Sequence, residues 1–113
     1  MNEDIERSLL QNFMDFVESA DRDLANKKYN PAVINYFKSI VILCDWKIYK
    51  EIRLLPKNHA ERFQFLEIHL KEAYSIISPL FKKYTDSYNI RLTEKDAVLL
   101  KENVKKIKEL FDY

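Results

Sequence analysis

The chain has 113 residues, of which 47% are hydrophobic and 33% are charged, and its formal net charge is +1. A chain of this length typically forms one domain that buries roughly two thirds of its unfolded surface, so we expect a single domain over residues 1–113. There is no glycine in the chain. This excludes the phosphate-binding loop, the dinucleotide-binding fingerprint and the hydrolase nucleophile elbow, because each needs the backbone freedom of glycine.

Charge and hydropathy narrow the class of protein further. Residues 1–25 hold seven acidic side chains and two arginines, so the rest of the chain is basic. The pI of 7.8 lies below the value of about 9 that is typical of dedicated nucleic-acid binders. The longest apolar run, residues 40–44, is too short to cross a bilayer, and the acidic start does not resemble a signal peptide. We therefore expect a cytoplasmic protein without membrane contact, in which the single cysteine, Cys44, is buried.

The first predicted helix covers residues 4–26, where apolar side chains recur three and four residues apart. The second is predicted to begin with Asn30 as N-cap and Pro31 as first helical residue, and to end near Leu54. Residues 29–49, YNPAVINYFKSIVILCDWKIY, are apolar around most of a helix. Such a helix needs neighbours on several sides, so we expect it to be the centre of the core.

A third helix is predicted to begin after Asn58, because Asn58 and Glu61 are the N-cap and N3 types of a capping box. Its helical periodicity continues to residue 84. Pro79 must kink this segment or restart it with Ser78 as cap, and a break near Leu70 would also fit the pattern.

The last helix is predicted to begin at Thr93, with Asp96 three residues later as in a capping box. One of its sides is apolar. The other side is rich in lysine, which we interpret as a solvated face: Lys101, Lys105, Lys106 and Lys108. Four or five amphipathic helices with short connections predict an all-α fold, a compact antiparallel four- to five-helix bundle.

The order of these elements resembles the HEPN domain family over roughly residues 15–111. The segments that carry the resemblance are KKYNPA at 27–32, YFKS at 36–39, the helix start with His59, DSY at 86–88 and TEKDA at 93–97. The resemblance implies a HEPN-like helical bundle that often pairs as a homodimer. In many members it also implies a metal-independent RNase or toxin that is partnered by a minimal nucleotidyltransferase, while other members bind nucleotides or RNA without cleavage.

Active members of that family carry an arginine followed four to six residues later by histidine, in the region that corresponds to residues 82–88. Here that region reads KKYTDSY and has neither residue. We therefore predict a ligand site without cleavage: Lys82 and Lys83 can hold a phosphate by charge, and Tyr84 or Tyr88 can stack on a base, with Asp86 between them. The alternative is a basic patch beside aromatic core residues.

A second set of candidate residues lies on the third helix. His59 precedes Arg62 by three residues, which places the two on adjacent turns of one face. A neutral imidazole can accept a ribose proton while a guanidinium stabilises the phosphorane, so this pair could act as an RNase. His69 shares a face with Arg62 at roughly 10 Å along the helix. The structural alternative is that His59 completes a helix start and Arg62 is a surface cation.

Three functions therefore remain open. The first is a HEPN-like interaction module, dimeric, which binds a protein, nucleotide or RNA partner without catalysis. The second is a toxin-antitoxin RNase that uses Arg62 with His59 or His69, and the third is a purely structural helical partner protein.

The expected dimer surface consists of Tyr36, Trp46 and Tyr49, which exceed what one small bundle is expected to bury around one helix. We expect no metal and no cofactor, because the two histidines lie on different helix faces without a completing carboxylate.

Overall fold

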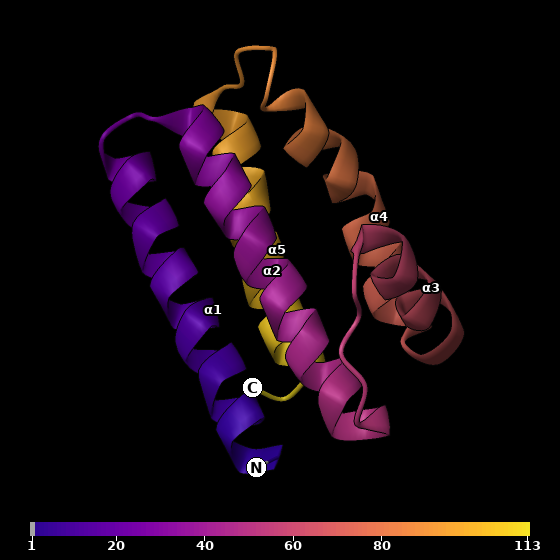
Figure 1. Cartoon of the computed structure of the whole chain (residues 1–113). Helices are drawn as coiled ribbons and strands as arrows, with labels where there is room; N and C mark the ends of the chain where they lie inside the picture. The colour runs from indigo at the N-terminus through magenta and orange to yellow at the C-terminus, as the bar shows by residue number, and fades with distance from the viewer. Residues whose placement is uncertain (1) are drawn as a thin grey trace.

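The computed structural model describes residues 2–113, and within them it is all-helical, as predicted (Figure 1). Its helices are α1 (Asn2–Ala25), α2 (Tyr29–Ile52), α3 (His59–His69), α4 (Lys71–Asp86) and α5 (Glu94–Leu110). None of the helices in this described part of the chain combines the length and the apolar character needed to span a bilayer.

The helices are arranged around α2. On one side α1 packs along most of its length, α5 lies along another side, and α3 and α4 cover the remainder (Figure 1). Consecutive long helices are antiparallel, as expected. However, α2 and α5 run in the same direction, because α3 and α4 return the chain to the beginning of α2 before α5 starts (Figure 1). The rings of Trp46 and Tyr113, near the ends of α2 and the chain, accordingly lie 5.7 Å apart.

The central position predicted for residues 29–49 is confirmed, since 13 of the 24 residues of α2 are buried. Cys44 is among them, and burial raises the pKa of its thiol well above the usual value, so it remains a protonated packing group. The hydroxyl of Ser39 is equally buried and donates to the carbonyl of Tyr36 within the helix. The core is therefore organised around one helix, most of whose circumference is covered by other helices.

The predicted helix boundaries are confirmed where local capping determines them. The side chain of Asn58 accepts the N–H of Glu61 at the start of α3, and Thr93 with Asp96 forms a reciprocal capping box at the start of α5. The break near Leu70 is also found, between α3 and α4. The restart at Ser78 is wrong, because α4 continues through Pro79.

The predicted role of Asn30 as an N-cap is wrong. The helix already begins at Tyr29, and Asn30 is a buried residue of its first turn. Its side-chain amide donates to the carbonyls of Ser87 (2.8 Å) and Ile90 (2.7 Å), while its oxygen accepts the N–H of Leu92 (3.0 Å). A local capping bond is thus replaced by three bonds that fasten the α4–α5 loop to α2.

We predict that Asn30→Ala lowers the free energy of unfolding by about 3 kcal/mol, because it leaves buried backbone groups of the loop without partners. Chemical denaturation measures the loss. Asn89→Ala, an exposed asparagine in the same loop, is the matched control and should change stability by less than about 0.5 kcal/mol. Equal losses in the two variants would contradict the anchoring role of Asn30.

Candidate functional site

A buried ion pair between α2 and α3 occupies the place where the sequence predicts a catalytic arginine. Arg62 is only 9% exposed, and it donates from Nε to Oδ1 of Asp45 at 2.6 Å and from Nη2 to Oδ2 at 2.9 Å. Its Nη1 lies 3.0 Å from Nδ1 of His59. The predicted proximity of His59 and Arg62 is therefore confirmed, whereas the reading of Arg62 as a surface cation is wrong, because packing of α3 on α2 buries it.

The contact with Arg62 determines the protonation state of His59. A guanidinium can only donate, so Nδ1 must be the accepting, unprotonated nitrogen of a neutral ring. Burial and the positive charge of Arg62 both lower the pKa of His59, and Asp45 opposes this shift. The imidazole also packs against the rings of Phe81 (5.3 Å between centroids) and Tyr84 (5.9 Å). His59 is thus a neutral packing and hydrogen-bonding group.

The electrostatics of Asp45 fit the same arrangement. Burial raises the pKa of its carboxyl, and the two hydrogen bonds from Arg62 oppose that rise. A guanidinium binds a phosphate through two parallel hydrogen bonds from one of its edges. In Arg62 the Nε–Nη2 edge already makes such a pair of bonds to the carboxylate of Asp45. Asp45 was not among the residues singled out from the sequence, although it is the one carboxylate within the apolar residues 29–49 and was an available signal.

The structure does not bring His69 to this cluster. It is exposed at the end of α3, ten residues and roughly 15 Å along the helix from His59. Its ring lies 6.5 Å from that of Phe65, measured between centroids. Within residues 2–113, no group of three or more histidine, cysteine, aspartate or glutamate side chains is placed to hold a metal ion.

Both lysines of the predicted ligand site are paired with carboxylates. The ammonium of Lys82 lies 3.0 Å from Asp86 one turn further along α4, and that of Lys83 lies 2.5 Å from Asp96 on α5. The bond from Lys83, with those from Thr93, lowers the pKa of Asp96. A phosphate would have to compete with these partners, so Lys83 in particular serves as a link between α4 and α5.

The two tyrosines of the same segment differ in exposure. Tyr84 stacks on Phe37 of α2 with 4.6 Å between ring centroids, and is therefore largely a packing residue. Its hydroxyl shares a 2.8 Å hydrogen bond with that of Tyr88, and this bond is the main cause that raises the pKa of Tyr84 to about 12. Tyr88 is 66% exposed and is the one ring of the pair available to a partner.

The predicted dimer surface is not available to a partner. Tyr36, Trp46 and Tyr49 expose at most 8% of their surface, because packing within one chain covers them. The premise that a single small bundle cannot bury these rings is therefore wrong. A homodimer remains a prediction, and these three side chains give it no surface.

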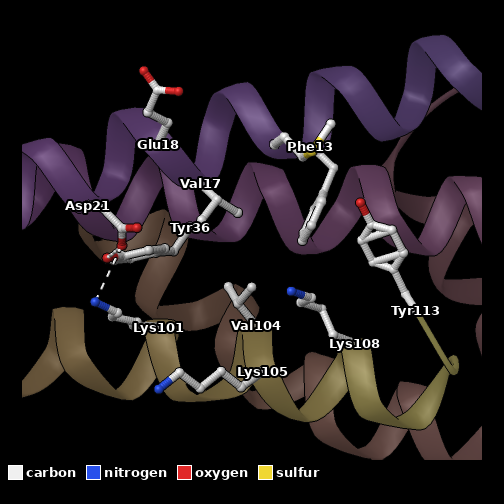
Figure 2. Close-up of a pocket in the computed structure, with 11 residues that line it drawn as sticks. Phe13, Val17, Glu18, Asp21, Tyr36, Lys101, Val104, Lys105, Lys108 and Tyr113 are labelled. Carbon is white, nitrogen blue, oxygen red and sulfur yellow. Dashed lines mark hydrogen bonds and ion pairs between the residues drawn. The ribbon is translucent and has the colours of Figure 1, made fainter.

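A groove of about 510 Å³ lies between α1 and α5, with α2 behind it (Figure 2). It exists because α1 and α5 both pack on α2 and scarcely contact each other. Its apolar lining combines residues of both walls, of α2 and of the chain end: Phe13, Met14, Val17, Tyr36, Val104 and Tyr113. Its volume is in the range of small-molecule sites, and it is the cavity we consider the candidate functional site.

Both ends of the groove are closed by contacts that cross it. At one end, Asp21 accepts a 2.5 Å hydrogen bond from the hydroxyl of Tyr36 and lies 3.5 Å from the ammonium of Lys101. Burial of the ring, and then this hydrogen bond, raise the pKa of Tyr36. At the other end, Tyr113 meets the ring of Phe13 edge-on at 5.5 Å (Figure 2). The groove is therefore a bounded site rather than an open channel.

The two walls of the groove carry opposite charge. On α1, Glu18 lies 3.9 Å from Arg22 and Asp21 is bonded as described, so both carboxylates have partners. On α5, Lys105 and Lys108 line the groove and make no ion pair with any residue in the described range 2–113. The ammonium of Lys108 lies 5.4 Å from the ring centre of Tyr113.

Sequence reasoning did not identify this groove. It assigned the lysines of the last helix to a solvated face. Lys101, Lys105 and Lys108 are four and three residues apart, which places all three on one side of the helix, and this spacing was an available signal for a basic site. Met14, beside the apolar stripe of α1, was a second available signal. Neither signal reveals that α1 is the facing wall.

We predict that removing one partner of the buried pair, as in Asp45→Ala, lowers the free energy of unfolding by about 3 to 5 kcal/mol, because Arg62 is left buried without a counter-charge. The double variant Asp45→Leu/Arg62→Met should lose markedly less. Denaturant titrations measure both. Lys82→Ala, which breaks an exposed pair, is the control and should change stability by less than about 1 kcal/mol. A double variant no more stable than Asp45→Ala would contradict this account.

Three of the segments that carry the HEPN resemblance, 27–32, 86–88 and 93–97, meet at one end of the molecule. Asn30 binds the loop that follows Ser87, and the hydroxyl of Tyr29 lies 3.4 Å from a carboxylate oxygen of Glu94. Comparison with protein-family models, curated proteins and solved structures finds no match for this chain. The resemblance therefore rests on these segments and remains a prediction.

Proposed function

We propose that this protein is a HEPN-like helical interaction module that binds its ligand in the groove between α1 and α5 and performs no chemistry of its own. The groove carries the proposal. It joins an apolar lining to two lysines without ion-pair partners in the described part of the chain. In the Asp45–Arg62–His59 cluster, by contrast, the guanidinium of Arg62 is already bonded to Asp45 and His59.

The composition of the groove supports ligand binding rather than simple packing imperfection. Met14 is 47% exposed and Tyr113 is 41% exposed, so large apolar side chains face solvent on both sides of it. Exposed apolar surface rimmed by charges marks binding sites on soluble proteins. A ligand that covered these residues would remove apolar area from water, which is favourable at about 25 cal/mol per Å².

We predict that a neutral solvatochromic dye such as Nile red binds the protein and is displaced by filling the groove. Val17→Trp places a large ring where Val17 now lines the cavity, and it should reduce dye binding at least tenfold while the circular dichroism spectrum stays helical. Ile68→Trp adds the same ring at an exposed position of α3 outside the groove and is the control. Undiminished binding to Val17→Trp, or no binding by the native protein, would refute a ligand site in this groove.

The RNase function is the second candidate, and the 3.0 Å contact between Arg62 and a neutral His59 is the observation that favours it. A neutral imidazole can act as a general base. The one lone pair of the neutral His59 ring, on Nδ1, already accepts from Arg62, so this hydrogen bond would have to break before His59 could take a proton. Against it stands Asp45, which occupies the guanidinium edge.

We expect purified protein, incubated with structured and single-stranded RNA, to give the same cleavage background as His59→Gln. This substitution removes a titratable base while retaining a polar side chain. Gel electrophoresis of labelled RNA measures the rate. Cleavage by the native protein that falls at least a hundredfold in His59→Gln would establish the RNase and overturn the non-catalytic proposal.

A further inference from the structure

We infer that the α1–α5 groove binds a small amphipathic anion, a monocarboxylate with an elongated apolar body, as a free molecule from solution. The inference rests on the proposed function and adds the chemical class of the ligand. Three observations carry it: the closed ends of the groove, the uncompensated positive charge on one wall, and the apolar surface between the two.

The groove is long enough for a small molecule but too short for a partner helix. Along α1 the distance from Phe13 to Asp21 is eight residues, or roughly 12 Å. The Asp21–Lys101 pair bridges α1 to α5 at one end, and Tyr113 covers the other (Figure 2). A helix of more than about two turns would collide with one of these closures or have to break it, whereas an alkyl or aryl chain fits between them.

The charge of the groove selects an anion. Lys101 is neutralised by Asp21, and Glu18 is paired with Arg22 outside the groove. This leaves Lys105 and Lys108 as the positive groups at the rim (Figure 2). One turn apart on the same side of α5, they can share a single carboxylate. A cationic head group would meet two like charges and no free carboxylate among the lining residues.

The apolar lining selects the body of the ligand. Phe13 and Val17 from α1 face Val104 from α5 across the groove, and Figure 2 shows their side chains directed into the space between the two helices. The head group at Lys105 and Lys108 places the apolar chain along these three residues. A compact anion such as inorganic phosphate or acetate would leave this surface uncovered.

The test compares three ligands of equal chain length, decanoate, decanol and decylammonium, each below its micelle concentration. Calorimetric titration measures binding, and the fluorescence of Trp46, the single tryptophan of the chain, reports it independently because its ring lies 5.7 Å from Tyr113. We expect decanoate to bind about tenfold more tightly than decanol, and decylammonium and acetate not to bind measurably.

Variants test the site itself. Lys105→Ala/Lys108→Ala should weaken decanoate binding about tenfold and leave decanol unchanged. Lys95→Ala/Lys106→Ala removes the same charge from α5 at exposed positions outside the groove and is the matched control. Because all four lysines have exposed or half-exposed positions, both variants keep the native core.

The outcomes separate the inference from the proposed function. Equal affinity for decanoate and decanol would overturn the inference that the ligand is an anion. An equal loss of decanoate affinity in the two lysine variants would do the same, and either result would leave the groove as a site for neutral apolar ligands. Binding of an acidic amphipathic helical peptide in place of decanoate would also overturn it, by making a helix the occupant. Failure of Nile red and of every amphiphile to bind would overturn both.

Discussion

The apolar circumference of α2 is the constraint on which the rest of the structure depends. A helix that is apolar around most of its circumference cannot lie at a surface, so neighbours must cover most of its sides. Here α1, α5 and the α3–α4 pair do so, and Phe37 and Trp46 contact different neighbours accordingly. From the sequence, the aromatic side chains of this helix are more than one chain is expected to bury, which suggests a dimer. Because neighbours cover most of the helix, a single chain of 113 residues buries most of them.

Asp45 is a largely buried carboxylate on this helix, and its ion pair with Arg62 joins α3 to α2. A carboxylate among apolar neighbours needs a counter-charge, and Arg62 provides it in a bidentate arrangement that fixes how α3 lies on α2. The desolvation of two charges offsets much of their attraction, so the pair contributes more to the placement of α3 than to net stability. His59 completes the cluster as a neutral acceptor.

The groove follows from the same constraint. Because α2 is the surface on which both α1 and α5 pack, those two helices need no extensive contact with each other. They run antiparallel, which brings Asp21 to Lys101 at one end and Phe13 to Tyr113 at the other. The acidic helix α1 and the lysine-rich side of α5 thus form opposite walls of one site.

Local signals in the sequence determined the helices and their order. The capping side chains of Asn58 and Thr93, the break near Leu70 and the burial of Cys44 follow from neighbouring residues and from helical periodicity. Only the tertiary structure decided the role of Asn30, whose partner Leu92 is 62 residues away, and the burial of Arg62 by Asp45, 17 residues away. The groove likewise joins Phe13 to Tyr113. Such contacts depend on how helices pack around α2, and no periodicity within one helix encodes which residue of another helix it will face.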